Sequence, residues 1–241
     1  MIGHCIVTCE HGGNRLPTRF RSLFRDQWQV LHSHRGYDLG ALRLSREMAK
    51  MLDAEHYYSV VSRLLVDLNR TVGHHEHLSP TVAALDLPTQ LEIVQQYYDP
   101  YRNAVEHSVA DALARDQRVF HLSCHSFTEQ LGHQIRDAEI GLLFDPVRVA
   151  ESVLCSHWKD TLEELRPDLT VRFNYPYLGV DDGFIPALRG RYPHPLYVGV
   201  EIEVRQDVAA RADVRQALAT SLRAALGRFA GRRATDAPAP V

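Results

Sequence analysis

Residues 6–14 read Ile-Val-Thr-Cys-Glu-His-Gly-Gly-Asn, and this stretch predicts much about the fold around it. The first four residues are mostly apolar or β-branched, which is typical of a short buried strand. Glu10 and His11 are ionisable, and the glycines and Asn14 that follow favour a turn. Ligand sites of open α/β sheets lie beyond the carboxyl ends of strands, so we expect a catalytic or metal-binding loop here. The alternative is an ordinary strand–loop junction with a solvated histidine.

The length fits one large α/β domain or two small ones, and the lack of internal repeats, linkers and composition shifts favours one domain. The chain has 241 residues, of which 45% are hydrophobic, and can bury a sizeable core. Its net charge of −3, without a long basic run, argues against a nucleic-acid partner, and no apolar run is long enough to cross a bilayer. The first residues lack the pattern of a signal peptide, and no cysteines are spaced as Cys-x-x-Cys. We therefore expect reduced thiols and a cytoplasmic protein, with one domain over residues 1–230 and a flexible tail over 231–241.

Apolar strands and amphipathic helices alternate along the rest of the chain. We expect further strands over residues 57–66, 119–127, 139–144, 169–173 and 196–204. We expect helices over residues 38–53, 89–116, 145–165 and 207–230, the second kinked or divided at Pro100. Residues 73–88 should form a long loop of the kind that makes lids. This order predicts a sheet covered on both faces, whose strand ends gather at one edge.

Ionisable side chains recur at the ends of these expected strands. His125 closes residues 119–127 much as His11 closes the first strand, and Glu201 and Glu203 share one face of the last strand. Arg63 lies inside the apolar run of residues 60–66, where a charged side chain needs a partner. It either forms a structural pair with a carboxylate such as Asp67 or binds an anionic ligand. We favour the ligand, because Arg70 follows closely and arginine suits carboxylates.

These side chains together indicate a hydrolytic metal site. Two imidazoles and a carboxylate around zinc, with one position open to water, make a hydrolase centre. A further carboxylate can act as general base and acid, and arginines can hold an anionic substrate. The high count of 14 histidines is consistent with a metal.

The sequence resembles the N-formylglutamate amidohydrolase family. The resemblance rests on six segments that run from residue 9 to residue 207: residues 9–14, 34–41, 62–70, 124–127, 174–177 and 203–207. Residues 67–70, Asp-Leu-Asn-Arg, also look like the aspartoacylase branch of zinc carboxypeptidase-like enzymes.

The resemblance implies a fold, a reaction and a metal. The fold is a three-layer α/β, phosphorylase/hydrolase-like architecture (zinc carboxypeptidase-like), with a mixed central β-sheet flanked by helices. The reaction is the hydrolysis of N-formyl-L-glutamate, or a close analogue, to formate and glutamate, a step of histidine degradation. The cofactor is zinc or another divalent metal, and the partner is a small anionic substrate.

The resemblance also assigns roles to residues. The zinc carboxypeptidase pattern is His-x-x-Glu, but this chain has Asn14 at the last position, so the third ligand must come from elsewhere. We expect His11, His125 and Asp38 to bind the metal, with Glu10 as the alternative third ligand. Glu203 is the expected general base, and Glu201 the structural member of that pair. The residues expected to bind the substrate are Arg63, Asn69 and Arg70. Further candidates for the site are Asn14, His34 and Asn174.

Two other functions stay open at this point. The first is a thiol hydrolase that uses Cys124 or Cys9 with a neighbouring histidine such as His125. The second is a protein that keeps the fold and binds a metal or ligand without catalysis, which the departure at Asn14 favours.

Overall fold

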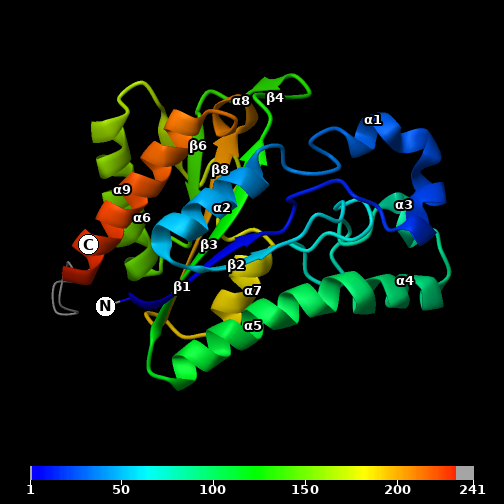
Figure 1. Cartoon of the computed structure of the whole chain (residues 1–241), viewed down its shortest axis with the longest axis horizontal. Coiled ribbons are helices and arrows are strands. Elements are labelled where there is room, and N and C mark those ends of the chain that lie inside the picture. Colours follow the sequence, from blue (N-terminus) through cyan, green and yellow to red (C-terminus); the bar gives the residue numbers. More distant parts are fainter. Residues whose placement is uncertain (1, 232–241) are drawn as a thin grey trace.

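The computed structural model describes residues 2–231, so the expected tail over 231–241 lies outside the described residues except for its first position. Six strands form one mixed sheet in the order β2-β1-β3-β8-β6-β7 (Figure 1). β1, β2, β3 and β8 run parallel, β6 runs antiparallel to β8, and β7 runs parallel to β6. The strands span Ile2–Cys9 (β1), Glu55–Tyr58 (β2), Arg118–Phe127 (β3), Ile140–Leu143 (β6), Val171–Phe173 (β7) and Tyr197–Arg205 (β8). The expected mixed sheet is confirmed.

Helices cover both faces of this sheet, which is why its central strands are buried throughout. On one face lie α2 (Ala41–Leu52), α6 (Val149–Leu165) and α9 (Ala212–Gly231), which enclose the largest apolar cluster. On the other face lie α5 (Asp99–Ala114) and α7 (Phe184–Arg191), with a smaller cluster around Ile6 and Phe184. This confirms the sheet covered on both faces that the order of strands and helices predicts, and the three-layer architecture that the resemblance implies.

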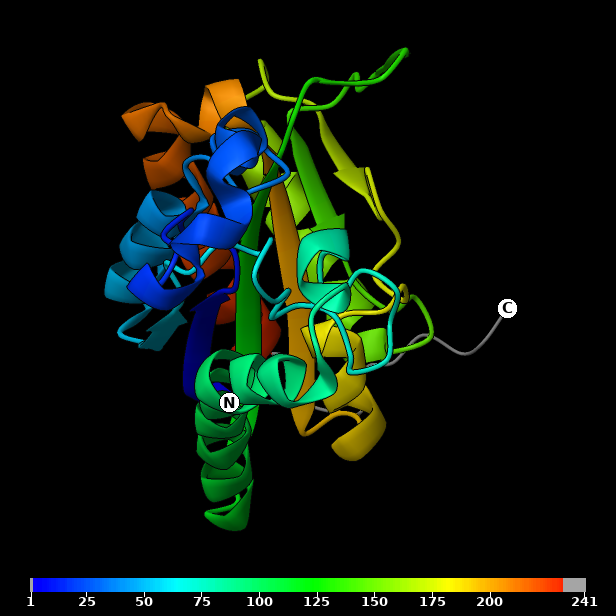
Figure 2. The ribbon, with the colours of Figure 1, turned by 90° about the vertical axis from the view of Figure 1, so that its right-hand side faces the viewer.

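A helical lobe extends beyond the sheet, next to the carboxyl ends of the parallel strands (Figure 2). It has its own apolar cluster, built on Phe20, Phe24, Leu65 and Ile93. Its helical segments are Thr18–Gln27 (η1, 3-10), Trp28–Leu31 (α1), Pro80–Ala83 (α3), Leu87–Ile93 (α4) and Val94–Tyr98 (η2, π). Two of these helices begin at side chains that accept hydrogen bonds from the backbone, Ser79 before α3 and Asp86 before α4, each followed by a proline in the first turn.

The strand expected over residues 57–66 is wrong beyond Tyr58, where β2 ends. The next residues leave the sheet because they pair with the loop after β1: Arg15 N donates to Val60 O at 2.9 Å, and Ser62 N donates to Arg15 O at 2.9 Å. The apolar residues that follow, Leu64 to Val66, pack in the helical lobe instead. The apolar residues that predicted a strand are therefore buried in a second hydrophobic core, that of the helical lobe.

Several expected helices also have different bounds. The helix expected from residue 145 begins at Val149, and the one expected from residue 38 begins at Ala41. The helix expected over residues 207–230 is divided into α8 (Gln206–Ala209) and α9. The helix expected over residues 89–116 is interrupted by the π turn of η2 just before Pro100, a residue that cannot donate a backbone hydrogen bond. A short hairpin, β4 (Gln130–Leu131) and β5 (Gln134–Ile135), had no clear sequence signal.

None of the helices within residues 2–231 combines the length and apolar character needed to cross a membrane.

Candidate metal and catalytic site

His11 is positioned by a close approach of two backbone segments at the end of β1. A Cβ on Gly13 would lie 2.7 Å from Val60 O, and one on Gly12 would lie 2.8 Å from Ser59 O, so larger residues would push the segments apart. Cys9 O also accepts a hydrogen bond from Ser59 N at 3.0 Å. The two glycines therefore let the chain turn sharply and leave the His11 ring buried at the edge of the sheet.

The His11 ring is oriented by a carboxylate. Its Nε2 lies 2.7 Å from Oδ1 of Asp67, a hydrogen bond between two buried groups. Its Nδ1 is also buried, and no hydrogen-bond partner for this atom exists among the described residues. Nδ1 faces Asp38, whose Oδ2 lies 3.4 Å away. When Nε2 carries the proton and donates it to Asp67, Nδ1 presents a free lone pair.

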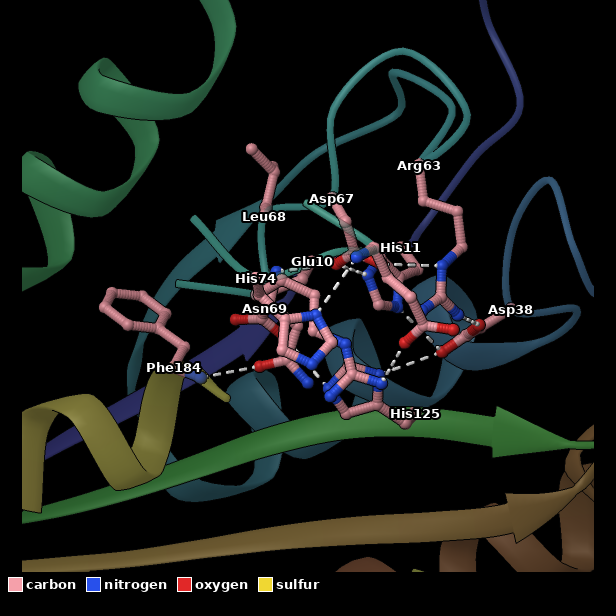
Figure 3. A network of polar contacts seen from close by, with 12 residues as sticks. Glu10, His11, Asp38, Arg63, Asp67, Leu68, Asn69, His74, His125 and Phe184 are labelled. Carbon is pink, nitrogen blue, oxygen red and sulfur yellow. Dashed lines mark hydrogen bonds and ion pairs between the residues drawn. The ribbon is translucent and has the colours of Figure 1, made fainter. Parts of the chain in front are cut away.

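His125, on β3, is oriented in the same way from the opposite side. Its Nε2 lies 2.8 Å from Ser123 Oγ and 3.2 Å from Glu10 Oε2, while its Nδ1 lies 2.9 Å from Asp38 Oδ2. Each histidine thus has a carboxylate on Nε2 and turns Nδ1 toward the same oxygen of Asp38 (Figure 3).

Asp38 is held in place by the backbone of His11, because Asp38 N donates to His11 O at 2.9 Å. It lies two residues before Gly40, whose φ of 86° is left-handed and whose position is close to Ala209, so glycine is required there. Asp38 therefore does not cap a helix; α2 begins after Gly40 without a side-chain cap.

The three side chains fit a divalent metal. One ligand atom from each of His11, Asp38 and His125 lies within 4.8 Å of the others. Two imidazoles and one carboxylate are a donor set that zinc accepts in catalytic sites, and carboxylates on the far nitrogens are the usual support of metal-binding histidines. The orphaned His11 Nδ1 is the atom that a cation would satisfy. Glu10, the alternative third ligand, instead contacts His125 Nε2 and Ser123 Oγ.

The protonation equilibria of these residues are tightly linked. Burial alone would lower the pKa of His125, but its hydrogen bonds to Asp38 and Glu10 outweigh burial and raise the pKa well above its usual range. The pKa of His11 is also raised, because Asp67 and Asp38 outweigh burial and the charge of Arg63. The carboxyl pKa values of Glu10, Asp38 and Asp67 are all lowered, since contacts with the histidines and with Arg63 overcome their burial. The carboxylates are thus ionised and available to support cations.

Glu201 and Glu203 reach the same cavity from β8, where they pair in register with Ser123 and His125 of β3. Burial raises the pKa of Glu203 to about 8, opposed by the charge of His125. Its Oε2 is buried and has no hydrogen-bond partner within residues 2–231. Glu201 differs because the Asn69 side chain donates a hydrogen bond to it. Among the described residues, the carboxylates paired with Arg63 are Asp38 and Asp67, not Glu201.

The two arginines expected to bind substrate already contact the protein's own acceptors. Arg63 Nη2 lies 2.7 Å from Asp67 Oδ2, and Arg63 Nη1 lies 3.6 Å from Asp38 Oδ1. Arg70 contacts Glu76 at 2.8 Å and donates to the carbonyl oxygen of Asp182 at 2.7 Å. Both still line the cavity, so their binding of a substrate stays a prediction.

Asn69 also lines this cavity, and its backbone and side chain both support the site. Its backbone N donates to Asp67 Oδ1 at 2.9 Å, and its Oδ1 accepts from Phe184 N at 2.8 Å. Asn69 therefore connects Asp67, the carboxylate behind His11, to the start of α7 (Figure 3). Its side chain also donates a hydrogen bond to Glu201.

The remaining candidates lie in different places. His34 lines the cavity, and burial and the charge of Arg136 lower its pKa. Asn174 Oδ1 accepts from Phe144 N and Gly179 N, each at 3.0 Å, so it holds a loop, and Asn174 is outside the cavity lining. Asn14 is likewise outside that lining. These two residues are therefore not brought to the site.

Sequence reasoning missed two residues behind the cluster and one in the cavity wall. Asp67 was considered only as a partner of Arg63, yet it also holds His11. Ser123 connects Glu10 to His125; it lies two residues before His125, so alternation along β3 was a usable signal. Arg136 lies just after the unpredicted hairpin, where no pattern pointed to the site.

The cavity beside the cluster has a volume of about 590 Å³ and is lined by charged side chains from the sheet edge and from the helical lobe. Its size suits a small molecule with several polar groups.

Comparisons with known proteins give a family and related folds. Residues 3–210 match the model of the N-formylglutamate amidohydrolase family. The structure is similar to that of a gene product from Agrobacterium tumefaciens, with a TM-score of 0.80 and 28% identity over 95% of this chain and 90% of the other. It is also similar to the N-formylglutamate amidohydrolase from Ralstonia eutropha JMP134, with a TM-score of 0.71 and 19% identity over 95% of each chain. The comparison with curated proteins gave no match.

Fold, cluster and family match together define a hydrolase that acts on amide bonds. The chain belongs to the N-formylglutamate amidohydrolase family.

Proposed function

We propose that the protein is a zinc-dependent amidohydrolase that cleaves the N-formyl amide of an acidic amino acid, N-formyl-L-glutamate or a close analogue. One observation is the main support for a metal site: His11 and His125 each have a carboxylate at Nε2, and both turn Nδ1 toward Asp38 Oδ2. The family match and the cavity of about 590 Å³ support the substrate class. A cytoplasmic location and a role in histidine degradation belong to the same proposal.

Within this proposal, His11, Asp38 and His125 would hold the cation. A bound divalent cation would polarise the acyl carbonyl, lower the pKa of a water molecule and favour the ionised forms of nearby carboxylates. Asp67 and Glu10 keep the two imidazoles in the tautomer that leaves Nδ1 free.

Glu203 is the group best suited to move the proton. It lies in register with His125, and its Oε2 is committed to no described partner. In the ionised form Glu203 accepts a proton from the attacking water, and it then donates that proton to the nitrogen of the leaving amino acid. Glu201 also faces the cavity, but it accepts a hydrogen bond from the Asn69 side chain, so it is less free to take a proton from water.

The thiol mechanism receives no support from the geometry. Cys124 packs in the cluster beneath α2, α6 and α9, on the other face of β3 from His125. Burial raises the pKa values of Cys124 and Cys9 well above their usual range, which keeps both thiols protonated and weakly nucleophilic.

Metal analysis and a chelator experiment test the proposal together. Purified protein should contain about one zinc per chain and release formate from N-formyl-L-glutamate. A strong chelator should abolish this activity, and added zinc should restore it. Metal-loaded protein that binds N-formyl-L-glutamate but never turns it over would instead support a non-catalytic binding protein.

A further inference from the structure

The wall of the cavity contains a buried arginine whose charge no described carboxylate balances. Arg136 is 4% exposed and lines the cavity directly after the β4–β5 hairpin, which extends from the end of β3 (Figure 1). Arg63 and Arg70, which line the same cavity, are both paired with carboxylates. Within residues 2–231, Arg136 has no such ion pair.

The contacts of Arg136 fix its position but leave part of its guanidinium free. Nη2 donates to Tyr177 OH at 3.0 Å, Nη1 donates to Thr128 O at 3.4 Å, and the guanidinium carbon lies 5.1 Å and 5.5 Å from the ring centroids of Tyr177 and Phe127. These neutral groups orient the charge without neutralising it. Nε is buried and has no hydrogen-bond partner among the residues that the structure describes.

A second unpartnered atom belongs to the same part of the wall. Thr128 lines the cavity, and its Oγ1 is buried without a hydrogen-bond partner in the described part of the chain. Leaving a buried charge and a buried hydroxyl unsatisfied costs stability in the free protein. A ligand that forms hydrogen bonds with both groups would remove this cost. A guanidinium with a nearby hydroxyl is complementary to a carboxylate.

We propose that Arg136, assisted by the Thr128 hydroxyl, binds a carboxylate of the substrate and thereby selects N-acyl amino acids. This inference rests on the proposed amidohydrolase function and names a specificity determinant for it. It differs from the expectation based on Arg63 and Arg70, whose charges the protein already balances. The carboxylate is either the α-carboxylate or the side-chain carboxylate of the substrate, and the two positions are separated by experiment.

Kinetics with three substrates tests the assignment: N-formyl-L-glutamate, its α-amide, and N-formyl-L-glutamine. Arg136→Gln should raise KM for N-formyl-L-glutamate by about 10- to 100-fold, the effect of losing a charge-assisted contact. One of the two amides lacks the carboxylate that Arg136 binds, and Arg136→Gln should leave KM for that amide unchanged. An unchanged KM for the α-amide would assign Arg136 to the α-carboxylate, and an unchanged KM for N-formyl-L-glutamine would assign it to the side-chain carboxylate. Equal losses for all three substrates would overturn the proposal and identify a structural role.

Matched variants strengthen the comparison. Arg136→Lys retains the charge but not the fork, so its KM should lie between those of the parent and Arg136→Gln. Thr128→Val should show the same substrate pattern with a smaller effect. Arg43→Gln removes an exposed arginine of α2 that is outside the cavity lining and should leave KM within about twofold, because a remote exposed charge contributes little. A loss in Arg43→Gln as large as that in Arg136→Gln would argue against a specific site.

A binding measurement separates this inference from the proposed reaction. L-Glutamate retains both carboxylates and is not hydrolysed, so calorimetric titration of the whole protein with L-glutamate does not depend on turnover. Affinity should fall about 10-fold or more in Arg136→Gln. If the parent protein is inactive but its binding of L-glutamate depends on Arg136, the proposed reaction is wrong and the proposed carboxylate site stands. Unchanged affinity in Arg136→Gln would overturn the carboxylate site even if the parent hydrolyses N-formyl-L-glutamate.

Discussion

Asp67 Oδ1 lies 2.7 Å from Nε2 of His11, and the other oxygen of Asp67 lies 2.7 Å from Nη2 of Arg63. The carboxylate therefore fixes the His11 ring from behind while the arginine holds the carboxylate. This arrangement is the reason that His11 Nδ1, rather than Nε2, faces Asp38. It also explains the partly buried arginine in an apolar run without any ligand, because Asp67 and Asp38 balance the charge of Arg63.

Asp67→Asn is the direct test of this relationship. The amide keeps the size of the carboxylate but no longer fixes the tautomer of His11 or balances Arg63. We expect zinc affinity to fall by about 10- to 100-fold, measured by competition with a chelator of known affinity. Asp181→Asn is the control, because Asp181 also lines the cavity but contacts Leu178 N rather than a histidine. Equal zinc affinities for Asp67→Asn and the parent would show that Asp67 does not support the metal.

The burial of the thiols predicts resistance to alkylation. Cys9 and Cys124 are fully buried, and burial raises their pKa values, so little thiolate forms at neutral pH. Treatment of the folded protein with iodoacetamide should leave hydrolysis intact, while a chelator should remove it. Mass spectrometry of the treated protein shows whether these two cysteines were modified. Loss of activity that tracks alkylation of Cys124, with no response to chelator, would revive the thiol mechanism.

Much of the sheet could be predicted because its central strands are buried on both faces. Runs of β-branched, aromatic and other apolar residues, interrupted by single polar ones, marked β3 and β8, and the ionisable groups near strand ends pointed to His11, His125 and Glu203. The run of residues 60–66 misled the prediction because burial in a second core gives the same hydrophobicity as burial in a sheet. Local pattern does not reveal which core a segment joins.

The support of the site was harder to predict than its ligands. The contacts of Asp67 with His11 and of Glu10 with His125 span 56 and 115 positions of the chain, and they depend on how loops fold over the sheet edge. Arg136 follows a hairpin of two-residue strands, too short to leave a periodic signal. Residue type can indicate that a metal site exists, but the choice of ring nitrogen depends on tertiary contacts.

His121 predicts how stability responds to acid. It is buried on β3, where its Nε2 lies 2.9 Å from Thr8 Oγ1 and its Nδ1 lies 2.8 Å from Tyr197 OH. Burial lowers its pKa from 6.5 to about 4, with Glu10 opposing the shift and Arg189 and Arg102 adding to it. Between these values the unfolded chain binds a proton that the folded chain does not. The free energy of unfolding therefore falls as pH drops through this window.

The size of this effect can be measured by difference. From about pH 7.5 to about pH 5, His121 should account for a loss of about 2 kcal/mol of unfolding free energy. His121→Gln keeps hydrogen-bonding groups but cannot titrate, so its stability should fall less over the same range, even if it is lower at neutral pH. Urea unfolding at both pH values gives the comparison. Parallel pH dependence in the two proteins would show that His121 does not titrate in this way.

The last prediction separates the two glutamates of β8. Both line the cavity from one face of the strand, but their surroundings differ: Glu201 is hydrogen-bonded to Asn69, whereas Glu203 has an unpartnered Oε2 within the described chain and a pKa raised by burial to about 8. A carboxyl group with a pKa close to neutral can both accept and return a proton. Glu203→Gln keeps the shape and removes the base, so kcat should fall by about 10²- to 10⁴-fold with zinc content unchanged.

Glu201→Gln is the matched comparison on the same strand face. It keeps an acceptor for the Asn69 side chain, so kcat should change by less than about 10-fold and the metal should stay bound. Zinc content, kcat and thermal stability should be measured for both variants under the same conditions. The reverse pattern, an active Glu203→Gln and an inactive, metal-loaded Glu201→Gln, would move the general base to Glu201. In that case the hydrogen bond from Asn69 would position the base, rather than mark Glu201 as a structural residue.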